Sequence, residues 1–83
     1  MRHAGQEALD RLEPLLAAVR RLPGLKERSR GIFYKGATAF LHFHEDPAGL
    51  FADMKVGAAF ERHDVSDATR QKAFAKIVKS AVA

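Results

Sequence analysis

Apolar residues recur at three- and four-residue spacing near the start of the chain and again at its end. This spacing predicts helices over about residues 6–22 and 67–82, each with one apolar stripe. Ser66 is the expected N-cap of the second helix. The predicted stripes consist of Leu9, Leu12, Leu15, Leu16, Val19 and Leu22 in the first helix, and of Phe74, Ile77, Val78 and Ala81 in the second.

Pro14 interrupts the first helical pattern. Because it cannot donate a hydrogen bond to the carbonyl of Asp10, the helix either kinks there or begins near Glu13. The pair Pro23-Gly24 ends the pattern. The following segment, Leu25–Arg30, is rich in cations and is expected to be a basic connector.

Alternating apolar and polar residues then predict four short strands, at about residues 31–35, 38–45, 50–56 and 59–64. The second and third strands are expected to form a hairpin with Pro47 and Ala48 at the centre of its turn. This turn pairs Leu41 with Met54, Phe43 with Ala52 and Glu45 with Leu50 on one face, and His42 with Asp53, His44 with Phe51 and Phe40 with Lys55 on the other.

The two flanking hairpins follow from their turn lengths. A two-residue Gly36-Ala37 loop places Ile32 opposite Leu41 and Tyr34 opposite Ala39, with Phe33 opposite Phe40 on the second face. In the last hairpin, a three-residue Val56-Gly57-Ala58 loop places Phe60 in the core and Glu61 and His63 on the second face. A two-residue Val56-Gly57 loop reverses those faces, and we favour the first register because it buries Phe60.

The predicted fold is a single α+β domain over residues 1–83, in two layers and in the order α-β-β-β-β-α. Its antiparallel meander packs one face on both helices. The predicted core residues of the sheet are Ile32, Tyr34, Leu41, Phe43, Ala52, Met54 and Phe60. Phe33, Phe40 and Phe51 are expected on the uncovered face, where three phenylalanines indicate an interface, most simply with a second copy in a homodimer.

Composition narrows the class of protein. The chain has 83 residues, 47% of them hydrophobic, and no cysteine, which excludes a disulfide framework and a thiolate zinc site. No apolar run is long enough to cross a bilayer and the N-terminus does not read as a signal peptide, so we expect a soluble cytoplasmic protein. The net charge is +4. We interpret it as an aid to solubility in preference to a sign of nucleic-acid binding.

His42 and His44 point to the same face of one strand, which is a geometry that can chelate a first-row metal. Asp53, opposite His42, is a candidate third ligand or an orienting group, and His63 and Glu61 would complete the set in the favoured register. A histidine opposite an aspartate on neighbouring strands is more often a hydrogen-bonded surface pair than a metal site. A divalent metal is the one cofactor that this pattern suggests.

General acid–base catalysis could use the same His–Asp pair beside Glu45 and Asp46. However, no serine lies near a nucleophile-type turn, and no glycine-rich phosphate loop is present. A short open sheet also offers little pocket volume. We therefore assign no catalytic residue and expect a protein that is not an enzyme.

The order of elements resembles that of the double-stranded-RNA-binding domain, over about Phe51–Ala81. This resemblance implies phosphate contacts from the start of the last helix, where Arg70, Lys72 and Lys76 are the nearest matches. The chain departs from that family because it lacks a glycine-rich approach to the helix and carries Asp64 and Asp67 there.

Most of the chain resembles small bacterial proteins that are usually labelled uncharacterised. The motifs that carry the resemblance are Leu12-Glu13-Pro14-Leu15-Leu16, Leu22-Pro23-Gly24, Gly31-Ile32-Phe33-Tyr34 and Phe40-Leu41-His42-Phe43-His44-Glu45-Asp46. The resemblance implies a bacterial, cytoplasmic, single-domain protein with no assigned activity. The first hypothesis is therefore a self-associating interaction module, with nucleic-acid binding and metal binding as the alternatives.

Overall fold

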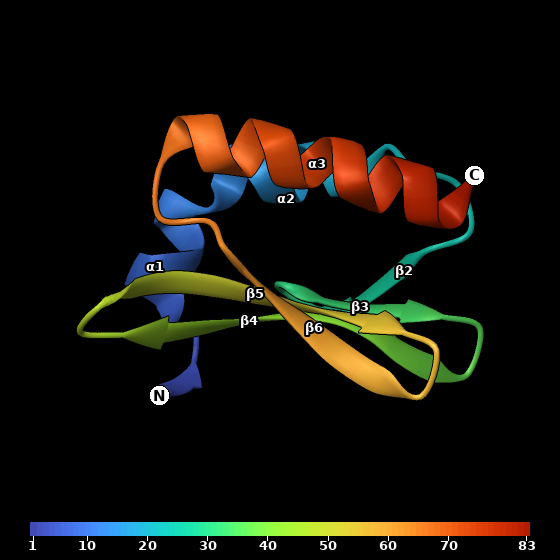
Figure 1. Ribbon diagram of the computed structural model, residues 1–83, viewed down its shortest axis with the longest axis horizontal. Helices are drawn as coiled ribbons and strands as arrows, with labels where there is room; N and C mark the ends of the chain where they lie inside the picture. Colours follow the sequence, from blue (N-terminus) through green and yellow to red (C-terminus); the bar gives the residue numbers. More distant parts are fainter.

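The computed structural model describes all 83 residues and contains three helices and a six-stranded antiparallel sheet. The elements are β1 (Arg2–His3), α1 (Gln6–Arg11), α2 (Glu13–Arg20), β2 (Lys26–Ser29), β3 (Ile32–Lys35), β4 (Thr38–Asp46), β5 (Gly49–Val56), β6 (Ala59–Asp64) and α3 (Ala68–Val82). Helices α2 and α3 lie on one face of the sheet (Figure 1). The α+β class and the antiparallel meander are confirmed.

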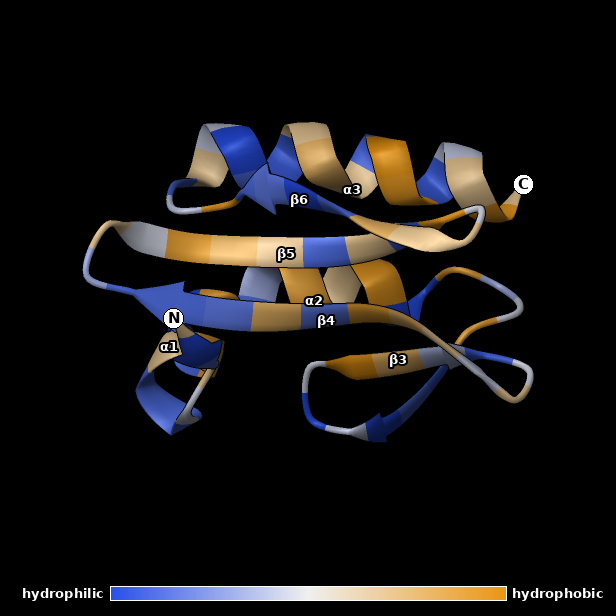
Figure 2. Ribbon diagram, turned by 60° about the horizontal axis from the view of Figure 1, so that its bottom comes forward, coloured by the Kyte–Doolittle hydropathy of each residue, from blue (hydrophilic) through white to orange (hydrophobic).

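The sheet follows the order β2-β3-β4-β5-β6, and β1 pairs separately with β4. Strand β3 pairs with the first half of β4, and β1 pairs with the second half, through His3 and His44. Because β5 occupies the other edge of β4, both partners share one edge. Figure 2 shows the opposite face of the sheet, which the helices leave uncovered. We call it the open face.

The first helical segment is divided at Leu12, which ends α1 and precedes α2. Pro14 then lies in the first turn of α2, where its missing N–H costs no helical hydrogen bond. The predicted break is confirmed. The N-cap of α3 is Asp67 and not Ser66, because the Asp67 carboxylate accepts the backbone N–H of Arg70 at 2.8 Å. The Ser66 hydroxyl instead accepts the N–H of Leu50.

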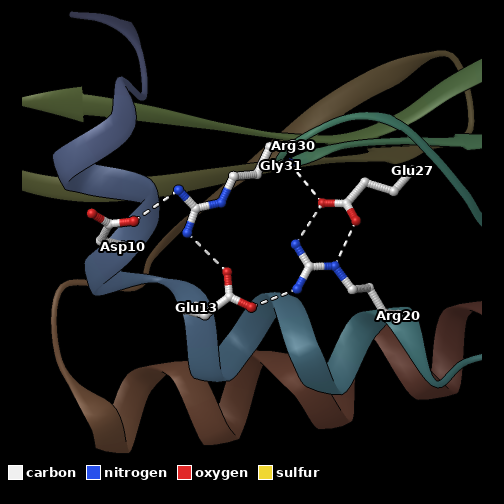
Figure 3. Close-up of polar contacts among 6 residues, drawn as sticks. All are labelled: Asp10, Glu13, Arg20, Glu27, Arg30 and Gly31. Carbon is white, nitrogen blue, oxygen red and sulfur yellow. Dashed lines mark hydrogen bonds and ion pairs between the residues drawn. The ribbon is translucent and has the colours of Figure 1, made fainter.

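The segment predicted as a connector contains the edge strand β2, so that prediction was wrong. Lys26 pairs with Tyr34 and Glu27 with Phe33, although β2 has no apolar residue to indicate a strand. Its position is secured by ion pairs to the helices (Figure 3). Glu27 accepts hydrogen bonds from Arg20 of α2 and from the N–H of Gly31.

The same network continues across the helices (Figure 3). Arg20 also contacts Glu13, and Arg30 contacts both Glu13 and Asp10 of α1. Burial alone would raise the pKa of the Glu27 carboxyl, but hydrogen bonds from Arg20 and Gly31 outweigh it and lower that pKa. This network holds α1, α2 and the β2–β3 hairpin together and has a structural role.

The β4–β5 hairpin has the predicted register, from Leu41 opposite Met54 to Asp46 opposite Gly49. The β3–β4 register was predicted correctly only at its turn. Tyr34 faces Ala39, but Phe33 faces Leu41, so Phe40 is the extra residue of a β-bulge.

The bulge corrects the positions of two phenylalanines. Phe33 and Phe40 are 1% and 6% exposed and belong to the hydrophobic core, so neither lies on the open face. Ile32 and Tyr34, predicted in the core, are only half-buried. A bulge places two consecutive side chains on one side of a strand, which explains why Phe40 and Leu41 are both buried.

Neither predicted register of the last hairpin is correct. Val56 faces Ala59 across a two-residue Gly57-Ala58 loop, and Lys55 faces Phe60. Phe60 is therefore on the open face and 44% exposed. Glu61 and His63 lie on the helix-covered side, where the His63 ring is 5.0 Å from that of Phe74. The favoured register failed because the core gained Phe33 and Phe40 in place of Phe60.

The core fills the space between the sheet and the helices. Its buried hydrophobic residues are Ala8, Leu9, Leu12, Leu15, Leu16, Val19, Phe33, Phe40, Leu41, Phe43, Leu50, Ala52, Met54, Val65, Phe74 and Val78. Of the stripe predicted for α3, Phe74 and Val78 are buried, whereas Ile77 is 39% exposed.

Candidate functional site

Three histidines meet on the open face. His42 and His44 project to the same side of β4, as the period of a strand requires. The third, His3, lies in β1 and pairs directly with His44. One ring nitrogen from each histidine lies within 4.8 Å of the other two. We call these three residues the histidine cluster.

The rings of the cluster are in direct contact. Nδ1 of His42 lies 2.9 Å from Nε2 of His44. The ring of His3 stacks on that of His44, with centroids 4.7 Å apart. Two nitrogens bound at 2.0–2.1 Å to one tetrahedral ion would be about 3.3 Å apart, a value that lies between the 2.9 Å of the His42–His44 pair and the 4.8 Å limit of the cluster.

Asp53 lies behind the cluster and is only 6% exposed. Its Oδ2 atom is 3.2 Å from Nε2 of His44. Both carboxylate oxygens also accept hydrogen bonds from Arg62, each at 2.8 Å. The hydrogen bond from the Arg62 side chain, more than the nearby charges, holds the pKa of Asp53 below its ordinary value. Asp53 is therefore an ionised carboxylate that can orient His44.

The sequence-predicted site residues thus have different outcomes. The structure brings His42, His44 and Asp53 together as expected. It does not add His63 or Glu61, which contact each other on the other side of the sheet. Sequence reasoning missed His3 and Arg62. Arg62 would have followed from the correct register of the last hairpin, but β1 is too short to give a periodic signal.

Electrostatics favours uncharged imidazoles in the cluster. Partial burial lowers the pKa of His42, and the neighbouring His44 and His3 lower it further against the opposing effect of Asp53. Burial also lowers the pKa of His44, and His3 and Arg62 act in the same direction, against the opposing effects of Asp53 and of a hydrogen bond to the Arg2 backbone. Neutral imidazoles keep a lone pair available, which is the state that binds a metal.

We expect the metal-free protein to lose stability as the pH falls below 6.5, the ordinary value from which both pKa values are lowered. The folded state then binds fewer protons than the unfolded state, so acidification favours unfolding. Urea denaturation with a chelator, at several pH values between about 7 and 5, measures this effect. A double variant with His42→Asn and His44→Asn should show a flatter profile; equal profiles would contradict the assignment.

The surroundings of the cluster are open. The ring of Phe60 lies 4.8 Å from that of His42 and forms one wall. None of the four clefts of the structure is lined by a histidine. Three imidazoles leave one position of a tetrahedral ion free for water.

The other predicted functional residues do not form a common site. Phe51 is half-buried on the open face, whereas Phe33 and Phe40 are in the core, so the aromatic interface loses two of its three residues. Self-association stays a prediction, but three exposed phenylalanines no longer support it. On α3, Arg70 pairs with Asp67 at 2.7 Å. Lys72 and Lys76 are exposed there.

Comparisons with known proteins add no assignment. No protein-family model matches the chain, and none of the curated proteins or solved structures gives a significant match. The resemblances to uncharacterised bacterial proteins and to the double-stranded-RNA-binding domain therefore stay predictions. In addition, none of the three helices has the length and apolar character that crossing a membrane requires.

Proposed function

We propose that this protein binds a divalent first-row metal ion through His3, His42 and His44. The observation that carries the proposal is the convergence of three imidazole nitrogens, from two strands, within 4.8 Å. Imidazole suits zinc, copper and nickel, whereas calcium and magnesium prefer oxygen ligands. Zinc is the first metal to test, because three histidines and one open position form a common zinc coordination.

The surrounding residues support this proposal. Partial burial keeps His42 and His44 neutral near pH 7, so protons compete weakly for the ligand nitrogens. Asp53 and Arg62 hold each other in place behind His44. Because Oδ2 of Asp53 faces Nε2 of His44, the nitrogen that also faces His42, Asp53 is placed as a further candidate ligand and not as a partner of the opposite ring nitrogen. The ladder between β1 and β4 positions His3 beside the other two rings.

Competition with a chromophoric zinc chelator tests the proposal at neutral pH. We expect one ion per chain. Zinc at about 100 times its dissociation constant should stabilise the fold by roughly 2.7 kcal/mol in a thermal denaturation experiment. The double variant with His42→Ala and His44→Ala should lose both effects, and His3→Ala should weaken binding. His63→Ala is the matched control, because this histidine lies on the other side of the sheet.

Two outcomes would overturn the proposal. One is a thermal midpoint that zinc, nickel and copper leave unchanged, together with a zinc–chelator absorbance that the protein does not reduce. The other is metal binding that survives in the double variant but disappears with His63→Ala. Circular dichroism of each variant checks that the fold is retained.

A further inference from the structure

The cations of this protein divide into two groups. Eight of the ten acidic side chains pair with an arginine or a histidine: Asp10, Glu13, Glu27, Glu45, Asp53, Glu61, Asp64 and Asp67. None of the six lysines has a carboxylate within 4.0 Å. The net charge of +4 is therefore carried on side chains that have no internal partner.

The two ends of the sheet differ in charge. The β4–β5 turn, on the left of Figure 1, carries Glu45 and Asp46. At the other end, the β3–β4 and β5–β6 turns lie together near the C-terminus of α3. This end carries Lys26, Lys35 and Lys55, and Arg28 extends over the Tyr34 ring. We call these four cations, with Tyr34 and Phe60, the basic end.

No carboxylate neutralises the basic end. The one acidic residue of β2, Glu27, faces the helices and is held by Arg20. The open-face partners at this end are uncharged in both β-ladders: Tyr34 lies opposite Lys26, and Phe60 lies opposite Lys55. A polyanion can therefore approach the sheet side of this surface without meeting an acidic side chain, and the one negative feature beside it is the C-terminal end of the α3 dipole near Ala81.

Aromatic rings accompany two of these cations, Arg28 and Lys55, on the open face. The Arg28 guanidinium lies 4.3 Å from the centroid of Tyr34. The Lys55 ammonium lies 6.0 Å from the centroid of Phe60. Phe60 is 44% exposed and has no place in the core, so its ring is available for stacking. Its contact with His42 holds one edge of the ring.

A cleft opens at the same end. Lys35, Thr38 and Lys55 contribute its polar groups, and Ala81 of α3 closes one side. Its volume is about 650 Å³, which accommodates a phosphate group and its sugar. The two lysines and the hydroxyl together provide donors for phosphate oxygens.

We propose that the basic end binds single-stranded nucleic acid. Lys35 and Lys55 hold a phosphate at the cleft, Lys26 and Arg28 contact the backbone further along, and a base stacks on Phe60. Single strands expose the base faces that such a ring requires, whereas a duplex keeps them stacked within the helix. The cleft is lined by residues of β3, β4, β5 and the end of α3 and does not include Arg70, Lys72 or Lys76, and the surface does not require a metal ion.

Fluorescence anisotropy with labelled single strands of about 12 nucleotides, in the presence of EDTA, tests this proposal. We expect the logarithm of the association constant to fall with the logarithm of salt concentration with a slope of about −3, for four phosphate contacts. Lys35→Ala with Lys55→Ala should reduce that slope by about 1.4 and weaken binding on the order of tenfold at low salt. Phe60→Ala should weaken binding by roughly tenfold, and Phe60→Tyr should restore it.

The matched control is Lys72→Ala with Lys76→Ala, which removes the same charge from α3. It should leave most of the affinity intact. The proposal is overturned by absence of binding at low salt, by an equal loss in the control, or by indifference to Phe60→Ala. Equal affinity for a duplex of the same length would also overturn it, because that result indicates a nonspecific polyanion surface. Because the metal is chelated throughout, none of these results depends on the histidine cluster.

Discussion

Replacing Phe33 by alanine is expected to lower the free energy of unfolding by about 3–5 kcal/mol. The Phe33 side chain is 1% exposed and lies opposite Leu41 on the helix-covered side of the sheet. Truncation removes a large buried surface and leaves a cavity that the surrounding core cannot fill. A domain of this size is stabilised by roughly 5–15 kcal/mol, so much of its stability would be lost.

Phe60→Ala provides the comparison, because Phe60 is 44% exposed on the open face. We expect it to change stability by about 0.5 kcal/mol or less. Urea denaturation of the two variants and the wild type measures both effects. Equal costs would show that Phe33 is not in the core, and that the bulge between β3 and β4 is misplaced.

Gly31→Ala is expected to destabilise the fold by about 2–4 kcal/mol. Gly31 has a φ of +81°, a conformation that costs any residue with a Cβ atom about 1–2 kcal/mol. A Cβ atom there would also lie 2.6 Å from Cδ2 of Leu9, which is buried in the core. Relief of that clash requires the end of the Leu9 side chain to move within the packed core, while the β2–β3 turn is held by the ion pairs of Figure 3.

Gly24→Ala separates the two contributions. Gly24 has nearly the same φ, +84°, but a Cβ atom there meets nothing within 4 Å. Its cost should be about 1–2 kcal/mol, from backbone strain alone. Thermal or urea denaturation of both variants gives the comparison. If the two costs are equal, the close approach of Gly31 to Leu9 does not constrain the packing.

The β4–β5 hairpin is the part of the fold that the local sequence pattern predicted best. Alternation from Leu41 to His44, with a turn at Pro47-Ala48, left one register that separates apolar from polar residues. That register correctly placed His42 opposite Asp53. Two of the three proposed metal ligands, His42 and His44, were therefore predictable, because they alternate along one strand of this local hairpin.

The rest of the site depends on contacts that no local pattern records. His3 reaches the cluster through a two-residue strand, more than 40 positions from its partner His44. Arg62 reaches Asp53 only because the last turn consists of Gly57-Ala58. Both turns considered from the sequence, the favoured Val56-Gly57-Ala58 and the alternative Val56-Gly57, differ from the observed one, although the alternative assigns Phe60, Glu61 and His63 to the observed faces.

The sequence by itself determined the helices, the four central strands, the break before Pro14 and the pairing of His42 with Asp53. Each follows from the periodicity or turn chemistry of a short segment. Only the tertiary structure decided that Phe33 and Phe40 enter the core, that Lys26–Ser29 forms an edge strand, and that His3 joins His42 and His44. The physical reason is that bulges, edge strands and final registers are selected by how the whole core fills, and core packing joins residues that are distant in the chain.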